Sequence, residues 1–290
     1  MIFLSVDLFL PLPELLDALS LGALTLAVIA LGLGFYGYVA DRVVFEDGGR
    51  LRTEKFSAVD ALAAAFLSAL FVLLVLEAIR APGAAPSQAI PSAGRMITGV
   101  VSSTAILMIL VGGILGGLSA RRIRWRDVFG LGRQSPGAVL GLAVLLLALA
   151  LPLVTASTVL SRLVLAAGGS EDDSSQELVR FLGTSGSHTA RWVVAASAVV
   201  GAPVLEEFIF RGYLYGVVRR YAGVTTGVIF NAALFAAIHT HLPSFGGLFV
   251  LAVCLTLAYE WTGSIFVPIT MHALFNASSV VMLLQGRTHG

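Results

Sequence analysis

Eight apolar segments, each about as long as a bilayer-crossing helix, recur along this chain of 290 residues. A membrane-spanning helix needs roughly 20 apolar residues. Charged residues make up only 12% of the chain, about half the fraction found in soluble domains. The sequence therefore predicts an all-α, polytopic membrane helix bundle of about eight transmembrane helices. They lie near residues 19–40, 58–78, 96–120 and 136–158, from residue 190 onward, and near 223–239, 245–261 and 264–284.

The pattern predicts an integral, multi-pass protein of a bacterial-type (inner) cell membrane, with the lipid bilayer as its first partner. The formal net charge of +1 gives no reason to expect a nucleic-acid partner. Twelve Lys and Arg residues fall in one alternate set of loops and six in the other, so the positive-inside rule places the first set in the cytoplasm. That set comprises Arg42, Arg50, Arg52, Lys55, Arg121, Arg122, Arg124, Arg126, Arg133, Arg211, Arg219 and Arg220.

Two adjacent carboxylates and an arginine interrupt the fifth apolar segment, where ionisable residues are expensive and usually functional. On a helix, Glu207 and Arg211 stand at i and i+4 and can pair, whereas Glu206 is rotated by about 100° and remains free for chemistry. Proline interrupts a running helix but can begin one, so Pro203 predicts a break or kink near Gly201. The two glutamates would then lie in the first turn of a new segment, where the helix dipole favours negative charge.

Further polar residues interrupt the last apolar segments. His239 closes the sixth segment, and His272 and Asn276 lie within the eighth, where i, i+4 spacing puts them on one helix face. If the three helices pack together, these residues and Glu206 converge on a polar pocket inside the bundle. Such a pocket could hold water away from lipid.

Three other polar residues in these segments have simpler interpretations. Asn231, in the middle of the sixth segment, is typical of a hydrogen bond between membrane helices. Glu260 stands beside Trp261 at the end of the seventh segment and is expected to be interfacial. His241 is expected to be a solvated loop residue, although it could take the place of His239.

Three motifs occur in a fixed order on separate apolar segments: Glu-Glu-x-x-x-Arg at 206–211, Phe-x-x-x-His at 235–239 and His-x-x-x-Asn at 272–276. Together they resemble the CAAX-protease and bacteriocin-processing (CPBP, or Abi) family of intramembrane endopeptidases. Any one motif alone is weak evidence, but three in order are specific. The resemblance covers about residues 199–278.

The resemblance implies that Glu206 and His239 activate a water molecule that hydrolyses a peptide bond of a membrane-associated peptide or protein. It also implies that His272 and Asn276 stabilise the oxyanion. The residue types agree, because a carboxylate and an imidazole form a general base near neutral pH. A His and an Asn side chain are suitable donors to developing negative charge.

The same resemblance implies that Glu207 and Arg211 hold the reactive carboxylate in place. It also divides the chain into generic N-terminal transmembrane helices, residues 1–189, and a CPBP-like catalytic helix core, residues 190–290. We expect the two parts to form one membrane domain.

Three alternatives remain. No cofactor is expected. Glu206, His239 and His272 could instead bind zinc, since the family was once described as metalloproteases. Against zinc, the chain has no His-Glu-x-x-His motif, and Asn is a poor zinc ligand. The scaffold could also serve as a non-proteolytic membrane immunity or binding protein. A proton-coupled transporter also uses membrane Glu and His, but the chain has no internal repeat.

Overall fold

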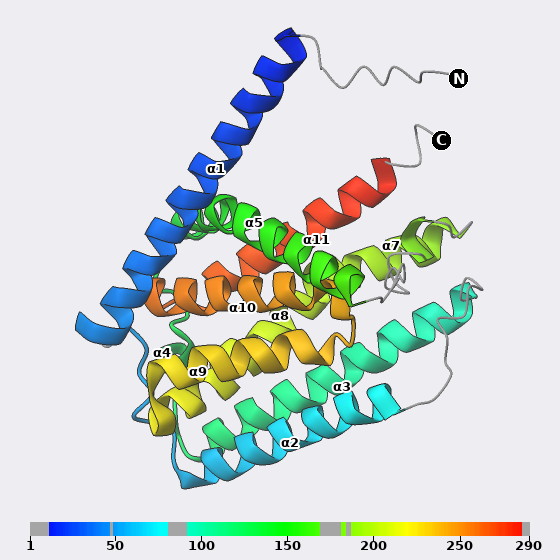
Figure 1. Cartoon of the computed structure of the whole chain (residues 1–290). Helices are drawn as coiled ribbons and strands as arrows, with labels where there is room; N and C mark the ends of the chain where they lie inside the picture. The colour runs from blue at the N-terminus through cyan, green and yellow to red at the C-terminus, as the bar shows by residue number, and fades with distance from the viewer. Residues whose placement is uncertain (1–11, 47–48, 81–91, 169–180, 184–186, 286–290) are drawn as a thin grey trace.

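The chain folds into a bundle of long helices, and no strand occurs in residues 12–46, 49–80, 92–168, 181–183 and 187–285, which the computed structural model describes. The predicted all-α fold is therefore confirmed. Figure 1 shows α9 packed between α2 and α10, with α3 running in a similar direction and α1 crossing the bundle at one edge. The helices are α1 (Leu12–Asp41), α2 (Ala58–Arg80), α3 (Ala93–Ala120), α4 (Trp125–Phe129), α5 (Pro136–Ala167), α7 (His188–Ala196), α8 (Ala202–Glu207), α9 (Gly216–Ile238), α10 (Leu242–Thr262) and α11 (Phe266–Gln285), with π-helical segments η1 (Arg42–Glu46), η2 (Ser197–Gly201) and η3 (Phe208–Tyr215).

Seven helices in the described part of the chain are long and apolar enough to cross a membrane. One of them, residues 188–238, is 51 residues long and far exceeds one span. Gly223 divides this run, because its φ of 85° and ψ of 171° are not helical. The chain then turns back, so that Phe235 packs edge-on against Phe210. The run therefore supplies the fifth and sixth predicted segments, in agreement with about eight membrane helices.

Of the break or kink predicted near Gly201, the break is wrong, because the backbone remains helical through Gly201 (φ −63°, ψ −56°) and Ala202 (φ −62°, ψ −51°). A π-helical segment, η2, immediately precedes the proline. In an α-helical turn the ring of Pro203 would clash with the carbonyl four residues back, and Pro203 has no N–H to donate. The wider π-helical turn accommodates both properties. The two glutamates consequently lie inside a continuous helical run, and the helix-dipole argument for them does not hold.

α10 lies in the middle of the bundle (Figure 1) and is the most buried of the seven long helices. In its most apolar stretch 56% of the residues are buried, against 6% in α3. Close packing on α5 requires small residues here, since a Cβ at Gly247 would collide with the side chain of Thr158. α10 therefore forms the interior of the bundle, and α3 presents most of its surface to the surroundings.

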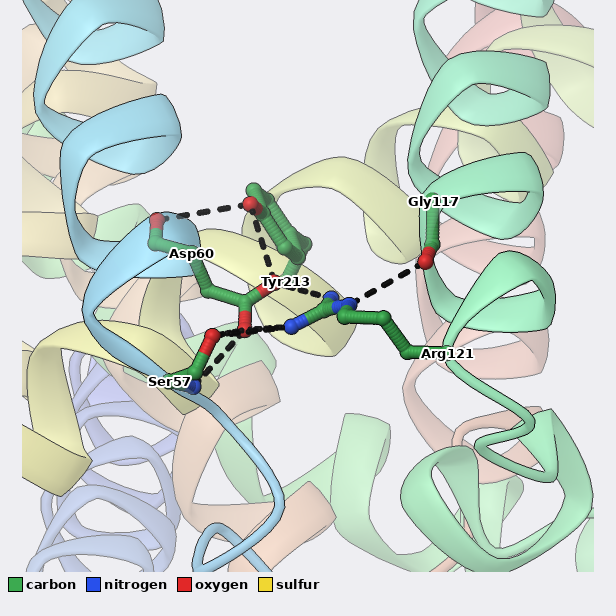
Figure 2. Close-up of polar contacts among 5 residues, drawn as sticks. All are labelled: Ser57, Asp60, Gly117, Arg121 and Tyr213. Atoms are coloured by element: carbon green, nitrogen blue, oxygen red, sulfur yellow. Dashed lines mark hydrogen bonds and ion pairs between the residues drawn. The ribbon is translucent and has the colours of Figure 1, made fainter.

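A polar cluster joins α2 and α3 to η3, as Figure 2 shows. Asp60 accepts the backbone N–H of Ser57 at 2.7 Å, as in a capping box at the start of α2. Arg121, just beyond α3, donates to both carboxylate oxygens of Asp60 at 2.5 and 2.6 Å. The hydroxyl of Tyr213 donates to the backbone carbonyl of Asp60 at 3.3 Å. This cluster fixes three helices at the end of the bundle that carries the basic loops.

Candidate active site

A cavity of about 500 Å³ opens within the helix bundle, and the four residues predicted to converge all line it. They are Glu206, His239, His272 and Asn276. Much of the remaining wall is apolar, but Arg162, His241 and several Ser and Thr residues also line it; the wall comes mainly from α3, α5, α7, α10 and α11. Polar groups gathered in a largely apolar cavity are typical of a ligand or active site.

Behind the cavity lies a fully buried ion cluster. Glu207 and Arg211 are both 0% exposed, and Nη1 of Arg211 donates to Oε1 of Glu207 at 2.8 Å. The expected i, i+4 pair is therefore present. The same carboxylate oxygen also accepts from Nδ1 of His272 at 2.8 Å, which the spacing of the motifs could not predict. Glu207 thus links the arginine to a residue of the cavity wall.

This contact determines how His272 can act. A carboxylate only accepts hydrogen bonds, so Nδ1 of His272 must carry a proton. Its other ring nitrogen, Nε2, lies 3.9 Å from Oε2 of Glu206. Because Nδ1 carries a proton, Nε2 of His272 accepts a hydrogen bond in the neutral ring and donates one in the imidazolium form.

His239 lies at the end of α9, and its Nδ1 bonds the backbone carbonyl of Phe235 at 2.7 Å. Because a carbonyl accepts, Nδ1 is the protonated nitrogen, and Nε2 keeps a free lone pair suited to a base. The ring of Phe235 is 4.9 Å from that of His239 and 5.7 Å from that of His272. The guanidinium carbon of Arg211 lies 4.4 Å from the centre of the Phe235 ring. Phe235 therefore packs against three polar residues, a role that the motif alone did not reveal.

Asn276 is oriented by the π-helical segment that precedes Pro203. Its amide Nδ2 donates to the backbone carbonyl of Ala198 at 2.8 Å. π-Helical turns shift backbone partners and are frequent at functional sites. One of the two amide hydrogens remains available, so the residue can still donate into the cavity.

The donor set fits zinc poorly. In the described residues no three His, Cys, Asp or Glu side chains are grouped so that they could hold a metal ion. Nδ1 of His272 is bonded to Glu207, and Nδ1 of His239 is bonded to a backbone carbonyl, so only Nε2 of each ring could bind a metal ion.

Two residues differ from their sequence interpretations. Glu260 is fully buried rather than interfacial, and Oε1 accepts from Tyr215 and pairs with Arg219, each at 2.6 Å. The sequence signal that could have indicated this is the i, i+4 spacing of Tyr215 and Arg219, which puts both side chains on one helix face. Asn231 is also 0% exposed, but its amide makes no hydrogen bond with any described residue, so the expected interhelical bond is absent.

Comparison with known proteins gives matches over about a third of the chain or less. Residues 188–278 match the family described as Type II CAAX prenyl endopeptidase Rce1-like. "Uncharacterized protein YpbD" of Bacillus subtilis (strain 168) is 36% identical over 76 residues, which is 25% of this chain and 36% of the relative. "Membrane-embedded CAAX protease MroQ" of Staphylococcus aureus (strain USA300) is 29% identical over 93 residues, 30% of this chain and 37% of the relative.

The matched part thus spans little more than a third of each relative's length. No solved structure matches the chain. The family match confirms the resemblance drawn from the three motifs, all of which fall within the matched residues.

Proposed function

We propose that this protein, whose residues 188–278 match the Rce1-like CAAX prenyl endopeptidase family, is an intramembrane endopeptidase. One observation carries the proposal: Glu206, His239, His272 and Asn276 meet on a single cavity within a bundle of membrane helices. That arrangement supplies a base and hydrogen-bond donors in a site enclosed by apolar walls, which peptide hydrolysis inside a membrane needs.

In the proposed reaction, Glu206 and Nε2 of His239 take a proton from a water molecule as its oxygen attacks the scissile carbonyl. The free lone pair of His239 supports this role. The tetrahedral intermediate then collapses, the carbon–nitrogen bond breaks, and the proton is delivered to the leaving amine. The water thus adds hydroxide to the carbonyl carbon and a proton to the nitrogen.

The oxyanion would be stabilised by Nε2 of His272 and the remaining amide hydrogen of Asn276. Because Nδ1 of His272 already donates to Glu207, this role requires the imidazolium form of the ring. Glu207 and Arg211 then act as positioning residues, since Glu207 fixes the orientation of the His272 ring and Arg211 holds Glu207. This extends the expectation that they merely support Glu206.

The substrate class we propose is a membrane-associated peptide or protein. Val154, Leu251 and Phe275 are among the apolar residues of the cavity wall and suit an apolar peptide segment. The relative named MroQ carries the description of a membrane-embedded CAAX protease, which supports a related activity here.

The test compares membrane peptides accumulated by cells carrying wild type, Glu206→Gln or Glu77→Gln. Glu206→Gln keeps shape but removes the base, so cleavage should fall at least about 100-fold while the protein accumulates normally. Glu77 is an exposed carboxylate of α2 and serves as the matched control. Unchanged peptide profiles with Glu206→Gln would instead favour a non-proteolytic membrane protein.

We also propose that the reaction needs no metal. The purified enzyme should then keep its activity in excess chelator, and metal analysis should find no stoichiometric ion. Loss of cleavage with chelator and its recovery with zinc would reverse this assignment in favour of the Glu206, His239 and His272 set.

The protein is a multi-pass membrane protein, and we propose a bacterial-type inner membrane with the basic loops in the cytoplasm. A cysteine placed at Arg122 should resist an impermeant thiol reagent in whole cells. The native Cys254 is 2% exposed and gives little background. Rapid labelling would contradict the assigned orientation. It would also place the active-site cavity, which lies at the other end of the bundle, on the cytoplasmic side.

A further inference from the structure

A second cavity, of about 400 Å³, lies among the basic loops at the opposite end of the bundle from the candidate active site. Four arginines from two distant parts of the chain line it. One wall comes from the connection that precedes α2, and the other from the connection between α3 and α5. The complete lining is Arg52, Arg124, Arg126, Asp127, Leu131, Gly132 and Arg133.

The lining holds four arginines and one carboxylate, so its formal charge is positive. Asp127 is the sole carboxylate of the lining, and Lys55 already binds it at 3.2 Å. The hydrogen bond from Lys55 holds the pKa of the Asp127 carboxyl below its usual range, so the group is ionised at neutral pH. Arg133 donates to the backbone carbonyl of Arg50 at 2.8 Å.

Among the described residues, the side chains of the other three arginines, Arg52, Arg124 and Arg126, make no hydrogen bond or ion pair within 4 Å, and Arg52 and Arg124 interact with Asp127 only at longer range. Converging guanidinium groups repel one another unless an anion lies between them. Their planar, multiple N–H donors match the oxygens of a phosphate group, to which arginine binds with charge-assisted hydrogen bonds.

The scaffold behind the arginines is firmly held. α4 carries Arg126, and its last residue, Phe129, packs edge-on against Phe208 at 5.2 Å between ring centres. The backbone carbonyl of Phe129 accepts the N–H of Ile265 at 3.1 Å. The carbonyl of Val128 accepts the hydroxyl of Tyr259 at 3.3 Å. The pocket is therefore built on a segment fixed to three other helices or turns.

Its position is also that of a membrane interface. The pocket lies between the end of the apolar helix α3 and the start of the apolar helix α5. The half-exposed Trp125 is next to it in the chain, and tryptophan is enriched at the headgroup level of membranes. Basic pockets at this depth on the cytoplasmic side are known to receive lipid headgroups.

We propose that this pocket binds the phosphate group of an anionic ligand. Two sources carry such a group at this position: the headgroup of an anionic lipid and a soluble phosphate compound. The inference stands on the arginine pocket alone and does not depend on peptidase activity.

The experiment measures binding to the full chain in non-ionic detergent by calorimetry at constant ionic strength. The probes are short-chain phosphatidylglycerol, short-chain phosphatidylcholine and inorganic phosphate. Phosphatidylglycerol should bind and phosphatidylcholine should not. Binding of inorganic phosphate as tight as that of phosphatidylglycerol would identify a soluble phosphate compound as the source.

Two matched variants test the pocket itself. Arg124→Gln/Arg126→Gln should weaken binding roughly 10-fold or more, because two charge-assisted donors are lost. Arg122→Gln/Arg220→Gln removes the same charge from exposed positions of the same end, outside the pocket, and should change binding little. Arg52→Gln, from the other wall, should also weaken binding. No binding of either anionic probe, or equal losses in the two double variants, would overturn the proposal.

Discussion

Two ion pairs inside this protein have similar geometry but different surroundings. Glu207 and Arg211 pair at 2.8 Å with neither side chain exposed, whereas Asp60 and Arg121 pair at 2.5 Å with the arginine 32% exposed. The first pair sits behind the candidate active site, and the second joins helices near the basic loops (Figure 2). The Glu207–Arg211 pair is therefore the more buried of the two, although its distance between nitrogen and oxygen is the longer one.

The partners of the two pairs differ in kind. The third partner of Glu207 is His272, which lines the active-site cavity. The further partners of Asp60 are Ser57, at a helix start, and the hydroxyl of Tyr213. The buried pair is thus connected to the residues that would carry out the reaction, and the half-exposed one only to elements that hold helices together. The predictions below test that distinction.

The largest effect is expected at the fully buried pair. Glu207→Ala or Arg211→Ala leaves an unpaired charge in a low-dielectric interior, which costs about 3–5 kcal/mol. Both variants should show a large loss of thermal stability and of protein in the membrane, with activity falling as a consequence. Thermal unfolding and cleavage are to be measured on the same preparations.

Glu206→Gln is the control for this prediction, because Glu206 faces the cavity and does not belong to the pair. It should be as stable as wild type, or slightly more so, yet inactive, since catalytic groups are often kept at some expense to the fold. If Glu206→Gln still cuts at near wild-type rate while Glu207→Gln is folded but inactive, the two carboxylates have been assigned the wrong way round.

A smaller effect is expected at the half-exposed pair. Arg121→Ala leaves the buried Asp60 with its bonds to Ser57 and Tyr213 and removes a partner that is itself 32% exposed, so the loss should be about 1–3 kcal/mol. The specific activity of the folded fraction should stay close to wild type. A drop in specific activity without a drop in stability would mean that the cluster also positions the catalytic helix.

The helices and the clustering of the motifs were predictable because both follow from local sequence rules. Membrane spans depend on the length of apolar segments, and the i, i+4 pairing of Glu207 with Arg211 depends on helix periodicity. The convergence of His239 and His272 required only that three helices pack together. Their assigned roles remain predictions.

What the sequence could not reveal depends on contacts between distant segments. The bond between His272 and Glu207 joins residues 65 positions apart, and no spacing rule predicts it. Pro203 was expected to break its helix because the rule for proline assumes α-helical turns, and η2 departs from that geometry. Glu260 was taken as interfacial because its position near a helix end hides the fact that Tyr215 and Arg219 enclose it.

The smallest effect is expected at a third pair, Lys55 with Asp127, whose side chains are 30% and 42% exposed at 3.2 Å. Solvent and salt screen such a pair, so Lys55→Ala and Asp127→Asn should leave the unfolding temperature at neutral pH within error.

The pH dependence of this third pair has a definite sign. The hydrogen bond from Lys55 lowers the pKa of Asp127, so any contribution to stability is present above the unfolded pKa, near 3.9, and is lost as the pH falls through the folded value. Wild type and Asp127→Asn should therefore unfold at the same temperature at pH 7, and Asp127→Asn should lose slightly less stability below about pH 4. If Asp127→Asn were as damaging at neutral pH as Arg121→Ala, burial would not be what orders the three pairs. The ranking would then have to come from the elements that each pair connects.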